Sequence, residues 1–326
     1  MKKTCIQITA IVLLLSVNII NAQDVRYSQV FTSPLTLNPA LMNINDDLRV
    51  ILNHRMQWNA LNDGGYTTSS FTTLYPIFLD GRDGKLDFGL NAIMDKAGAF
   101  NNLNISLSVG YGLKITTSSY LSLALSGGYV QKSLDASNLI FDDQYVLGSY
   151  NSSNVTEETV LKENVGYPDV NFGLLWSIRP DDSKLNAYIG ASGFHMSQPN
   201  ESFTNETGYL PRKFSFQSGL KIIGETKLDF TPNIIVTTQS GAQEVAAGLY
   251  MDYKLSDDAK LTIGGWYRIK DAFACILKVE FKNFVLGYSY DIPNSELGRT
   301  ISGLNTHEIS LSFKLNRYEE ESISSL

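Results

Sequence analysis

Apolar and polar residues alternate strictly along residues 103–116. One face of this stretch carries only glycine and polar side chains, and the other carries Leu103, Ile105, Leu107, Val109, Tyr111, Leu113 and Ile115. A period of two indicates a β-strand, because successive side chains of a strand point to opposite faces of the sheet. An apolar face of this length, opposed by small and polar residues, is typical of a membrane barrel with a polar lumen.

The same two-residue period recurs along the chain and predicts fourteen strands. They are expected near 48–58, 66–78, 85–95, 102–117, 119–132, 169–179, 184–196, 212–223, 226–238, 244–255, 260–270, 272–282, 283–292 and 305–316. The fold class that follows is all-β, a single antiparallel transmembrane β-barrel over residues 48–316 with a short N-terminal periplasmic segment. Ile93 and Leu175 break the alternation, because each is apolar on the polar face of its strand.

The connections between the predicted strands alternate between short and long. Short polar turns follow the even-numbered strands and hold the Gly, Asp, Ser and Pro residues that tight reversals need. The longest loops follow odd-numbered strands, at 133–168 and 197–211. Bacterial outer-membrane barrels have short periplasmic turns and long outer loops, so both ends of this chain are expected in the periplasm.

The first 22 residues have the layout of a secretory signal peptide. Lys2 and Lys3 precede an apolar run, and Ala22 marks the expected cleavage site. A single-span anchor is the alternative, but the run is shorter than the roughly 20 apolar residues that a spanning helix needs. Cleavage would leave Cys275 as the only cysteine, so no internal disulfide is expected. A β-barrel is the other structure that can cross lipid with its backbone satisfied.

The chain is acidic, with a formal net charge of −7 that becomes −9 without Lys2 and Lys3. This balance gives no sign of a basic surface for nucleic acid or anionic lipid. An electrostatic partner of the protein is therefore expected to be basic.

Neither metal binding nor catalysis is indicated by the chemically active residues. The three histidines, His54, His195 and His307, fall in separate strands without a second ligand at metal-site spacing. No nucleophile motif singles out a serine, and the Asp doublets lack the spacing of a calcium loop. The protein is therefore predicted to be no enzyme and to hold no cofactor or metal.

The region before the first strand, residues 23–47, does not alternate and contains prolines that oppose strand pairing. Two interpretations stay open: a periplasmic leader that packs where it can, or a plug folded into or under the lumen. We hypothesise that it forms one structural unit with the end of the first strand and closes the periplasmic end or lower lumen. In this unit Arg55 and Gln57 share a face and Arg55 donates to leader carbonyls, while Trp58 points the other way as an interface anchor. The partner motif consists of Tyr27, Ser28, Gln29, Asn38, Pro39, Ala40, Arg55, Gln57 and Trp58.

This front motif resembles the PorP/SprF family of type IX secretion system membrane proteins. The match rests on Tyr27-Ser28-Gln29, Pro34-Leu35, Leu37-Asn38-Pro39-Ala40 and Arg55-x-Gln57-Trp58, and the segments at 86–90 and 120–125 are similar too. The resemblance spans essentially the chain after the signal peptide. The polar tail at 317–326 departs from it, because it follows the last strand where a barrel-assembly signal is expected.

The resemblance implies an outer-membrane component that supports the secretion or surface anchoring of large adhesins, with a link to gliding motility. Its partners would be membrane lipid, an adhesin with a C-terminal sorting domain, and periplasmic or outer-membrane secretion machinery. The alternative is an outer-membrane channel for small hydrophobic molecules, and a phospholipase is more distant. Fold alone cannot decide. An apolar path through the lumen would favour a channel, and a blocked lumen would favour docking.

Overall fold

Fourteen antiparallel strands close into one barrel in the computed structural model, which describes residues 24–58, 65–79, 84–135, 142–146, 149–151, 163–180, 183–204, 206–295, 298, 300 and 303–315. They are β1 (Leu48–Gln57), β2 (Tyr66–Phe78), β3 (Gly84–Ala97), β4 (Phe100–Lys114), β5 (Ser119–Leu134), β8 (Asn164–Ile178), β9 (Leu185–Phe194), β10 (Lys213–Ile222), β11 (Leu228–Gln239), β12 (Ala242–Lys254), β13 (Ala259–Arg268), β14 (Ala272–Phe281), β15 (Phe284–Pro293) and β16 (Thr306–Leu315). All fourteen predicted strands are confirmed. The expected signal peptide at 1–22 and the tail at 317–326 lie outside the described residues.

Each barrel strand pairs with its neighbours along the chain, and β1 pairs with β16 to close the barrel. Between β5 and β8 the chain forms a short helix, η4 (Asp142–Gln144), and a separate two-stranded sheet of β6 (Tyr145–Val146) and β7 (Ser149–Tyr150). No helix within the described residues is long and apolar enough to cross a membrane.

The two faces of the barrel wall have opposite polarity. In β4, Leu107 points outward with 65% of its surface exposed, whereas Ser108 points inward and is 1% exposed. The same division holds for the other strands, so the outer surface is a broad apolar band and the inner wall is largely polar. A water-soluble protein buries its apolar side chains and exposes few large apolar patches. The reversed arrangement is that of a barrel surrounded by lipid.

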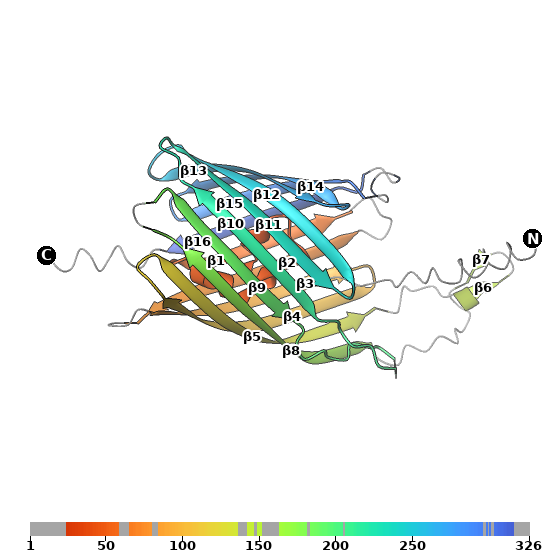
Figure 1. Ribbon diagram of the computed structural model, residues 1–326. Helices are drawn as coiled ribbons and strands as arrows, with labels where there is room; N and C mark the ends of the chain where they lie inside the picture. The colour runs from red at the N-terminus through yellow and green to blue at the C-terminus, as the bar shows by residue number, and fades with distance from the viewer. Residues whose placement is uncertain are drawn as a thin grey trace, which may run out of the picture.

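The two ends of the barrel differ in their connections (Figure 1). The long loops, between β5 and β8, β9 and β10, and β15 and β16, all lie at one end, which we call the long-loop end. The opposite, short-turn end carries the turns before β3, β5, β9, β11, β13 and β15, together with the start of β1 and the end of β16. The alternation predicted from the sequence is therefore present, although three connections at the long-loop end are also short.

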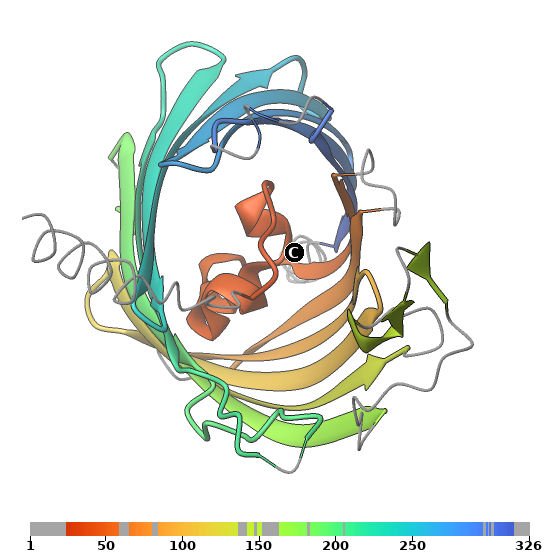
Figure 2. The ribbon, with the colours of Figure 1, turned by 90° about the vertical axis from the view of Figure 1, so that its right-hand side faces the viewer.

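Residues 24–47, which we call the leader, lie inside the barrel (Figure 2). They form three short helices, η1 (Val30–Thr32), α2 (Pro34–Leu37) and η2 (Pro39–Ile44). The sequence Asn38-Pro39 starts η2 because the Asn38 side chain accepts a hydrogen bond of 2.8 Å from the Ala40 N–H, and Pro39 sits at the first helical position where its missing N–H costs nothing.

Candidate functional site

The leader threads the lumen from one end to the other. Asp24, its first described residue, forms an ion pair with Lys213 at the start of β10, at the long-loop end. Asp46, near its last residue, forms an ion pair with Lys85 at the start of β3, at the short-turn end. The described chain therefore begins at the long-loop end. This differs from the expectation that both ends of the chain lie at the short-turn, periplasmic end.

At the long-loop rim, Asp24 joins a group of buried charges. Its carboxylate lies 2.6 Å from Lys213 Nζ and 2.8 Å from His195 Nε2, and His195 Nδ1 lies 2.9 Å from Asp169 Oδ2. Burial alone would lower the pKa of His195, but its hydrogen bonds to Asp169 and Asp24 outweigh burial and raise the pKa to about 9. Burial alone would raise the pKa of Asp24, but Lys213 and His195 hold it well below the ordinary value. His195 is thus a cation between two carboxylates at neutral pH.

Ser28 is the centre of a second network, which we call the latch, formed by Ser28, Arg55, Arg268, Asp291 and Glu308. The Ser28 hydroxyl donates to Asp291 Oδ2 at 2.6 Å and accepts from Arg55 Nη1 and Arg268 Nη1. The Ser28 N–H donates to Glu308 Oε2 at 2.7 Å. Two guanidinium groups and two carboxylates thus enclose one leader hydroxyl.

The charged side chains of the latch come from four different strands, β1, β13, β15 and β16. Arg55 donates to Asp291 and to Glu308, each at 3.2 Å, and Arg268 donates to Asp291 at 2.8 Å. All four charged groups are buried. A buried ion pair gains little net stability over an apolar pair, but removal of one member leaves an uncompensated buried charge at a cost of about 3–5 kcal/mol. The latch therefore fixes the position of the leader more than it adds to stability.

Gln29 extends the latch along β16. Its N–H donates to Glu308 Oε1 at 3.1 Å, its side-chain amide donates to the Glu308 carbonyl, and its Oε1 accepts from Ser310. Asn53 of β1 also donates to Glu308 Oε1 at 2.8 Å. The Glu308 carboxylate is fully buried and receives bonds from the leader and from β1 together.

The middle of the leader rests on β8 and β9. The Asn38 amide donates to the backbone carbonyls of Leu174 at 3.0 Å and Ala191 at 3.3 Å, while its oxygen caps η2. This close approach needs glycine in the wall, since a Cβ on Gly173 would lie 2.1 Å from Asn38 Oδ1 and 2.7 Å from the Ala40 nitrogen. Asn38, Pro39 and Ala40 therefore dock on the wall as one unit.

Apolar packing surrounds this part of the leader. Leu35, Leu37, Ala40, Leu41 and Met42 form one buried cluster with inward-facing residues of the wall. Leu175, which breaks the alternation of β8, is 1% exposed and belongs to this cluster. An apolar residue on the polar face of a strand thus marks a contact with the leader.

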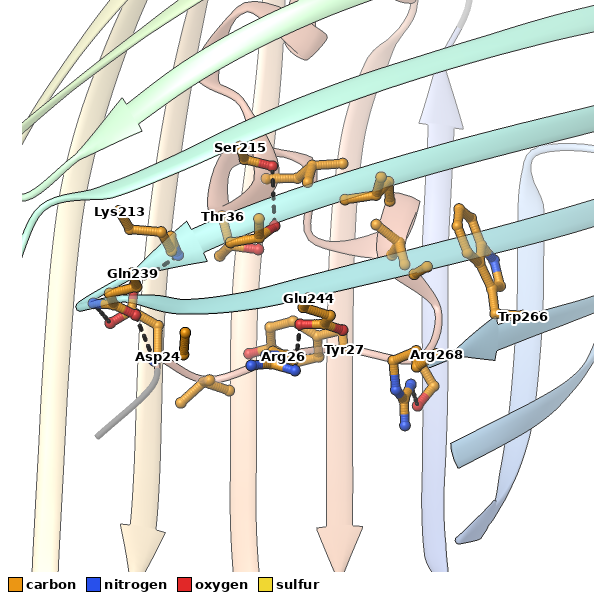
Figure 3. A pocket seen from close by; sticks show the side chains of 18 residues that line it. Asp24, Arg26, Tyr27, Thr36, Lys213, Ser215, Gln239, Glu244, Trp266 and Arg268 are labelled. Atoms are coloured by element: carbon orange, nitrogen blue, oxygen red, sulfur yellow. Dashed lines mark hydrogen bonds and ion pairs between the residues drawn. The ribbon is translucent and has the colours of Figure 1, made fainter. Parts of the chain in front are cut away.

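Two cavities remain in the lumen, one on each side of the leader. The cavity at the long-loop end has a volume of about 90 Å³ and is shown in Figure 3, where Arg26 and Asp24 approach Glu244 and Lys213 across it. The cavity at the short-turn end has a volume of about 460 Å³. The two share no lining residue, and Phe31 of the leader packs between them against the rings of Tyr188, Tyr250 and Trp266.

The predicted motif is therefore divided between two places. Ser28 meets Arg55 and the neighbouring Gln29 bonds to Glu308, but toward the long-loop end and not at the periplasmic end or lower lumen where the hypothesis put the unit. The leader runs the full height of the lumen, and its beginning, not its end, lies beside Arg55. Arg55 donates to side chains, not to the predicted leader carbonyls.

Gln57 and Trp58 lie at the edge of the latch. Gln57 accepts a long hydrogen bond of 3.5 Å from Arg55 Nη2. Trp58 follows β1 with a φ of 59°, donates its N–H to the Asn305 carbonyl, and stacks edge-on with Tyr66 at 5.5 Å. It lines a small cleft together with Arg55 and Gln57. Its role as an interface anchor stays a prediction.

Several residues of the site were not singled out by the sequence motif. Arg268, Asp291, Glu308 and Lys85 all carry a charge on the inward face of a strand. A charged residue at an inward-facing position of a strand indicates a candidate site residue. The sequence does not say which of these residues contact one another in the lumen. The part of the chain that the structure describes contains no group of three or more His, Cys, Asp and Glu side chains placed to hold a metal ion.

The fold and the site define a membrane β-barrel whose lumen holds an N-terminal leader. Comparison with known proteins agrees with this class. Residues 19–313 match the family model of the type IX secretion system membrane protein PorP/SprF. The chain therefore belongs to the PorP/SprF family, which confirms the resemblance seen in the front motif. No curated protein sequence matches the chain.

Solved structures share the fold at low sequence identity. The Ralstonia pickettii toluene transporter TbuX is 10% identical over 87% of this chain and 93% of its own, with a TM-score of 0.52. The Pseudomonas putida toluene transporter TodX is 11% identical over 89% of this chain and 95% of its own, also with a TM-score of 0.52. These similarities establish the barrel architecture and no more.

Proposed function

We propose that this protein is an outer-membrane docking barrel of the type IX secretion system, in which the leader seals the lumen and the long-loop end holds secreted adhesins at the cell surface. The observation that carries the proposal is the leader itself, which crosses the whole lumen and is held by buried charges along its length. A lumen filled by a fixed segment is compatible with docking, which needs no open path through the barrel. No chemical reaction is part of the proposal.

The orientation follows from the connections. Short turns face the periplasm and long loops face outward in bacterial barrels, so the long-loop end would meet the adhesin's C-terminal sorting domain. The short-turn end would meet periplasmic secretion machinery. A link to gliding would follow if the retained adhesin is one that moves along the cell surface.

The alternative is a channel for small hydrophobic molecules. It is supported by the architecture shared with barrels described as toluene transporters, but that similarity concerns the fold alone. The two lumen cavities share no lining residue and are separated by the buried aromatic ring cluster around Phe31. This arrangement favours docking over transport.

The test is a deletion strain complemented with the wild-type chain or with a chain lacking residues 24–41. Proteomic analysis of surface-shaved cells measures the adhesins that carry sorting domains. We expect the deletion strain to lose them, the wild-type chain to restore them, and the leaderless chain to insert in the outer membrane without restoring them. Unchanged surface adhesins in the deletion strain, together with lost uptake of toluene, would replace docking by transport.

A further inference from the structure

The cavity at the short-turn end has a positive charge that the acidic chain as a whole does not suggest. Its lining includes two carboxylates, Asp252 and Glu280, and six cations, which are Arg49, Arg179, Lys221, Lys260, Lys278 and Lys314. Five of the six cations come from strand ends around the wall, at β1, β8, β10, β13 and β16, and Lys278 comes from within β14. The net charge of −7 therefore conceals a basic mouth.

The carboxylates near this mouth are too few for the cations. Glu280 is shared by Lys260 at 2.9 Å and Lys314 at 2.8 Å. Asp229 is likewise shared by Lys221 at 3.6 Å and Lys254 at 3.9 Å. Arg49 is paired with Asp47 at 2.8 Å and Arg179 with Asp46 at 3.6 Å, so the unbalanced positive charge rests on the lysines. These are Lys221, Lys254, Lys260, Lys278 and Lys314, which face only three carboxylates, Asp229, Asp252 and Glu280.

Lys278 stands apart from these pairs. It lines the cavity from the middle of β14, and within the described residues it has no ion-pair partner. Its ammonium group lies 5.3 Å from the centre of the Tyr250 ring. A lysine held over an aromatic ring in a polar cavity can donate to an incoming anion without first breaking an ion pair.

The leader makes the other side of the cavity apolar. Phe31, Pro34, Leu41 and Ile44 line it, together with Tyr188 of the wall. A volume of about 460 Å³ falls within the range of small-ligand pockets, about 300–1,000 Å³. The cavity can therefore take apolar groups on the leader side and acidic groups on the wall side.

We propose that this cavity binds an acidic peptide segment of a partner protein, with one carboxylate on Lys278, an apolar side chain on the leader, and further carboxylates on the cations of the mouth. The excess of cations around the mouth favours a ligand with several negative charges over a small molecule with one. That the partner belongs to the periplasmic secretion machinery rests on the proposed function. The cavity and its charge do not depend on it.

The test uses the full chain in phosphatidylcholine nanodiscs, where both mouths are accessible. The probe is the hexapeptide Glu-Phe-Glu-Phe-Glu-Phe with a neutral fluorophore, and the matched peptide has Gln at each Glu position. Fluorescence anisotropy measures binding. We expect the acidic peptide to bind at least about tenfold more tightly than the Gln peptide, and its affinity to fall as salt is raised.

Variants locate the binding site. Lys278→Gln should weaken binding of the acidic peptide about tenfold, as expected for the loss of one charge-assisted hydrogen bond, and Lys278→Arg should retain it. Lys96→Gln, which removes an exposed lysine near the long-loop end, is the matched control and should have no effect. Equal binding of the two peptides, or equal affinity of the Lys278→Gln variant and wild type, would overturn the proposal.

Two other occupants give different results. If removal of residues 317–326, which include Glu319, Glu320 and Glu321, raises the peptide affinity several-fold, the chain's own tail is the occupant and the partner proposal is wrong. If dodecanoate binds more tightly than the peptide and depends on Lys278, the ligand is a small amphipathic acid and the proposal is again wrong. Failure here would leave the surface-adhesin result, and so the proposed function, unaffected.

Discussion

Arg55 and Glu308 are direct partners in the register of β1 and β16, the strand pair that closes the barrel, and their side chains meet at 3.2 Å beside the leader. The same Glu308 carboxylate accepts from the backbone N–H groups of Ser28 and Gln29, about 280 positions away in the sequence. Closure of the barrel and docking of the leader therefore use the same buried charge. We infer that the latch forms only when β16 is in its final register.

Removal of either charge should destabilise the barrel. Arg55→Ala leaves Glu308 without its buried cation and Asp291 with Arg268 alone, so we expect the free energy of unfolding to fall by about 3–5 kcal/mol. Glu308→Ala should have a similar effect. Urea unfolding in lipid vesicles, followed by tryptophan fluorescence, measures both.

A double-mutant cycle distinguishes a direct pair from two independent losses. Because the two side chains share one network, the Arg55→Ala/Glu308→Ala protein should lose less stability than the sum of the single losses. Lys184→Ala is a control, since its ion pair with Glu225 is solvent-exposed and should contribute less than about 1 kcal/mol. Strict additivity at Arg55 and Glu308 would contradict a coupled latch.

Docking of the middle of the leader depends on Gly173. Gly173→Leu should displace Asn38 and Ala40 from β8, because the new side chain occupies the space of the Asn38 amide. The leader should then become cleavable by chymotrypsin after Phe31, which packs among buried rings in the wild-type protein. Intact-mass spectrometry of the digested protein measures this cleavage.

The matched control for that variant is Gly127→Leu. A Cβ at Gly127 would have no heavy atom within 4 Å, and the residue points to the outer surface of β5. This variant should insert and resist chymotrypsin as wild type does. Equal protection of the leader in the two variants would show that glycine at 173 is not needed for docking.

The free-energy cost of introducing an arginine into a strand should depend on whether its side chain faces lipid or the lumen. Ile234→Arg places a charge on the outer face of β11, where an arginine near the bilayer midplane costs about 2–4 kcal/mol. Thr231→Arg on the same strand points into the short-turn cavity and should cost much less. Folding yields in phosphatidylcholine vesicles compare the two, and equal yields would refute the assignment of the outer face to lipid.

Most of the fold could be predicted from the sequence because the lipid-facing and lumen-facing positions of a strand carry different residue types, which alternate along the sequence. From Leu103 to Lys114 of β4, every outward position is apolar and every inward position is small or polar, so the period of two reports both the element and its orientation. Even the exceptions carried information, since Leu175 marks a contact between the wall and the leader. Strand order then followed from the short connections.

The site was less predictable because it is formed by residues that are distant in the sequence and come together only in the folded barrel. Ser28 and Glu308 are separated by almost the whole chain, and nothing in their local sequence indicates that they meet. The leader has no alternation to report its direction, so the sequence could not show that it runs from the long-loop end to the short-turn end. The sign of the charge at the short-turn mouth was hidden for the same reason, because the cations that form it come from six separate strands.

The rim group around His195 should respond to pH. His195 bridges Asp24 of the leader and Asp169 of β8, and these hydrogen bonds raise its pKa from about 6.5 to about 9 in spite of burial. Because the folded pKa is raised, the stabilisation is fully present below about pH 6.5 and is lost as pH rises through 9. The lowered pKa of Asp24 adds stabilisation that is present above about pH 4 and lost on further acidification.

The first residues of the leader should therefore be held most firmly from about pH 4 to pH 6.5 and should loosen above pH 9, with a loss of up to about 3 kcal/mol. Carbon-13 NMR of histidine in nanodiscs, with His54→Gln and His307→Gln to leave one signal, measures the titration of His195. Asp24→Asn should lower the observed pKa, because the imidazolium then keeps only the Asp169 carboxylate as an ionic partner. Glu201→Gln, which changes a carboxylate of the same rim that pairs with Lys132, is the matched control and should leave the pKa of His195 near 9. A wild-type titration at or below pH 6.5 would mean that the leader is not anchored to His195 in the membrane.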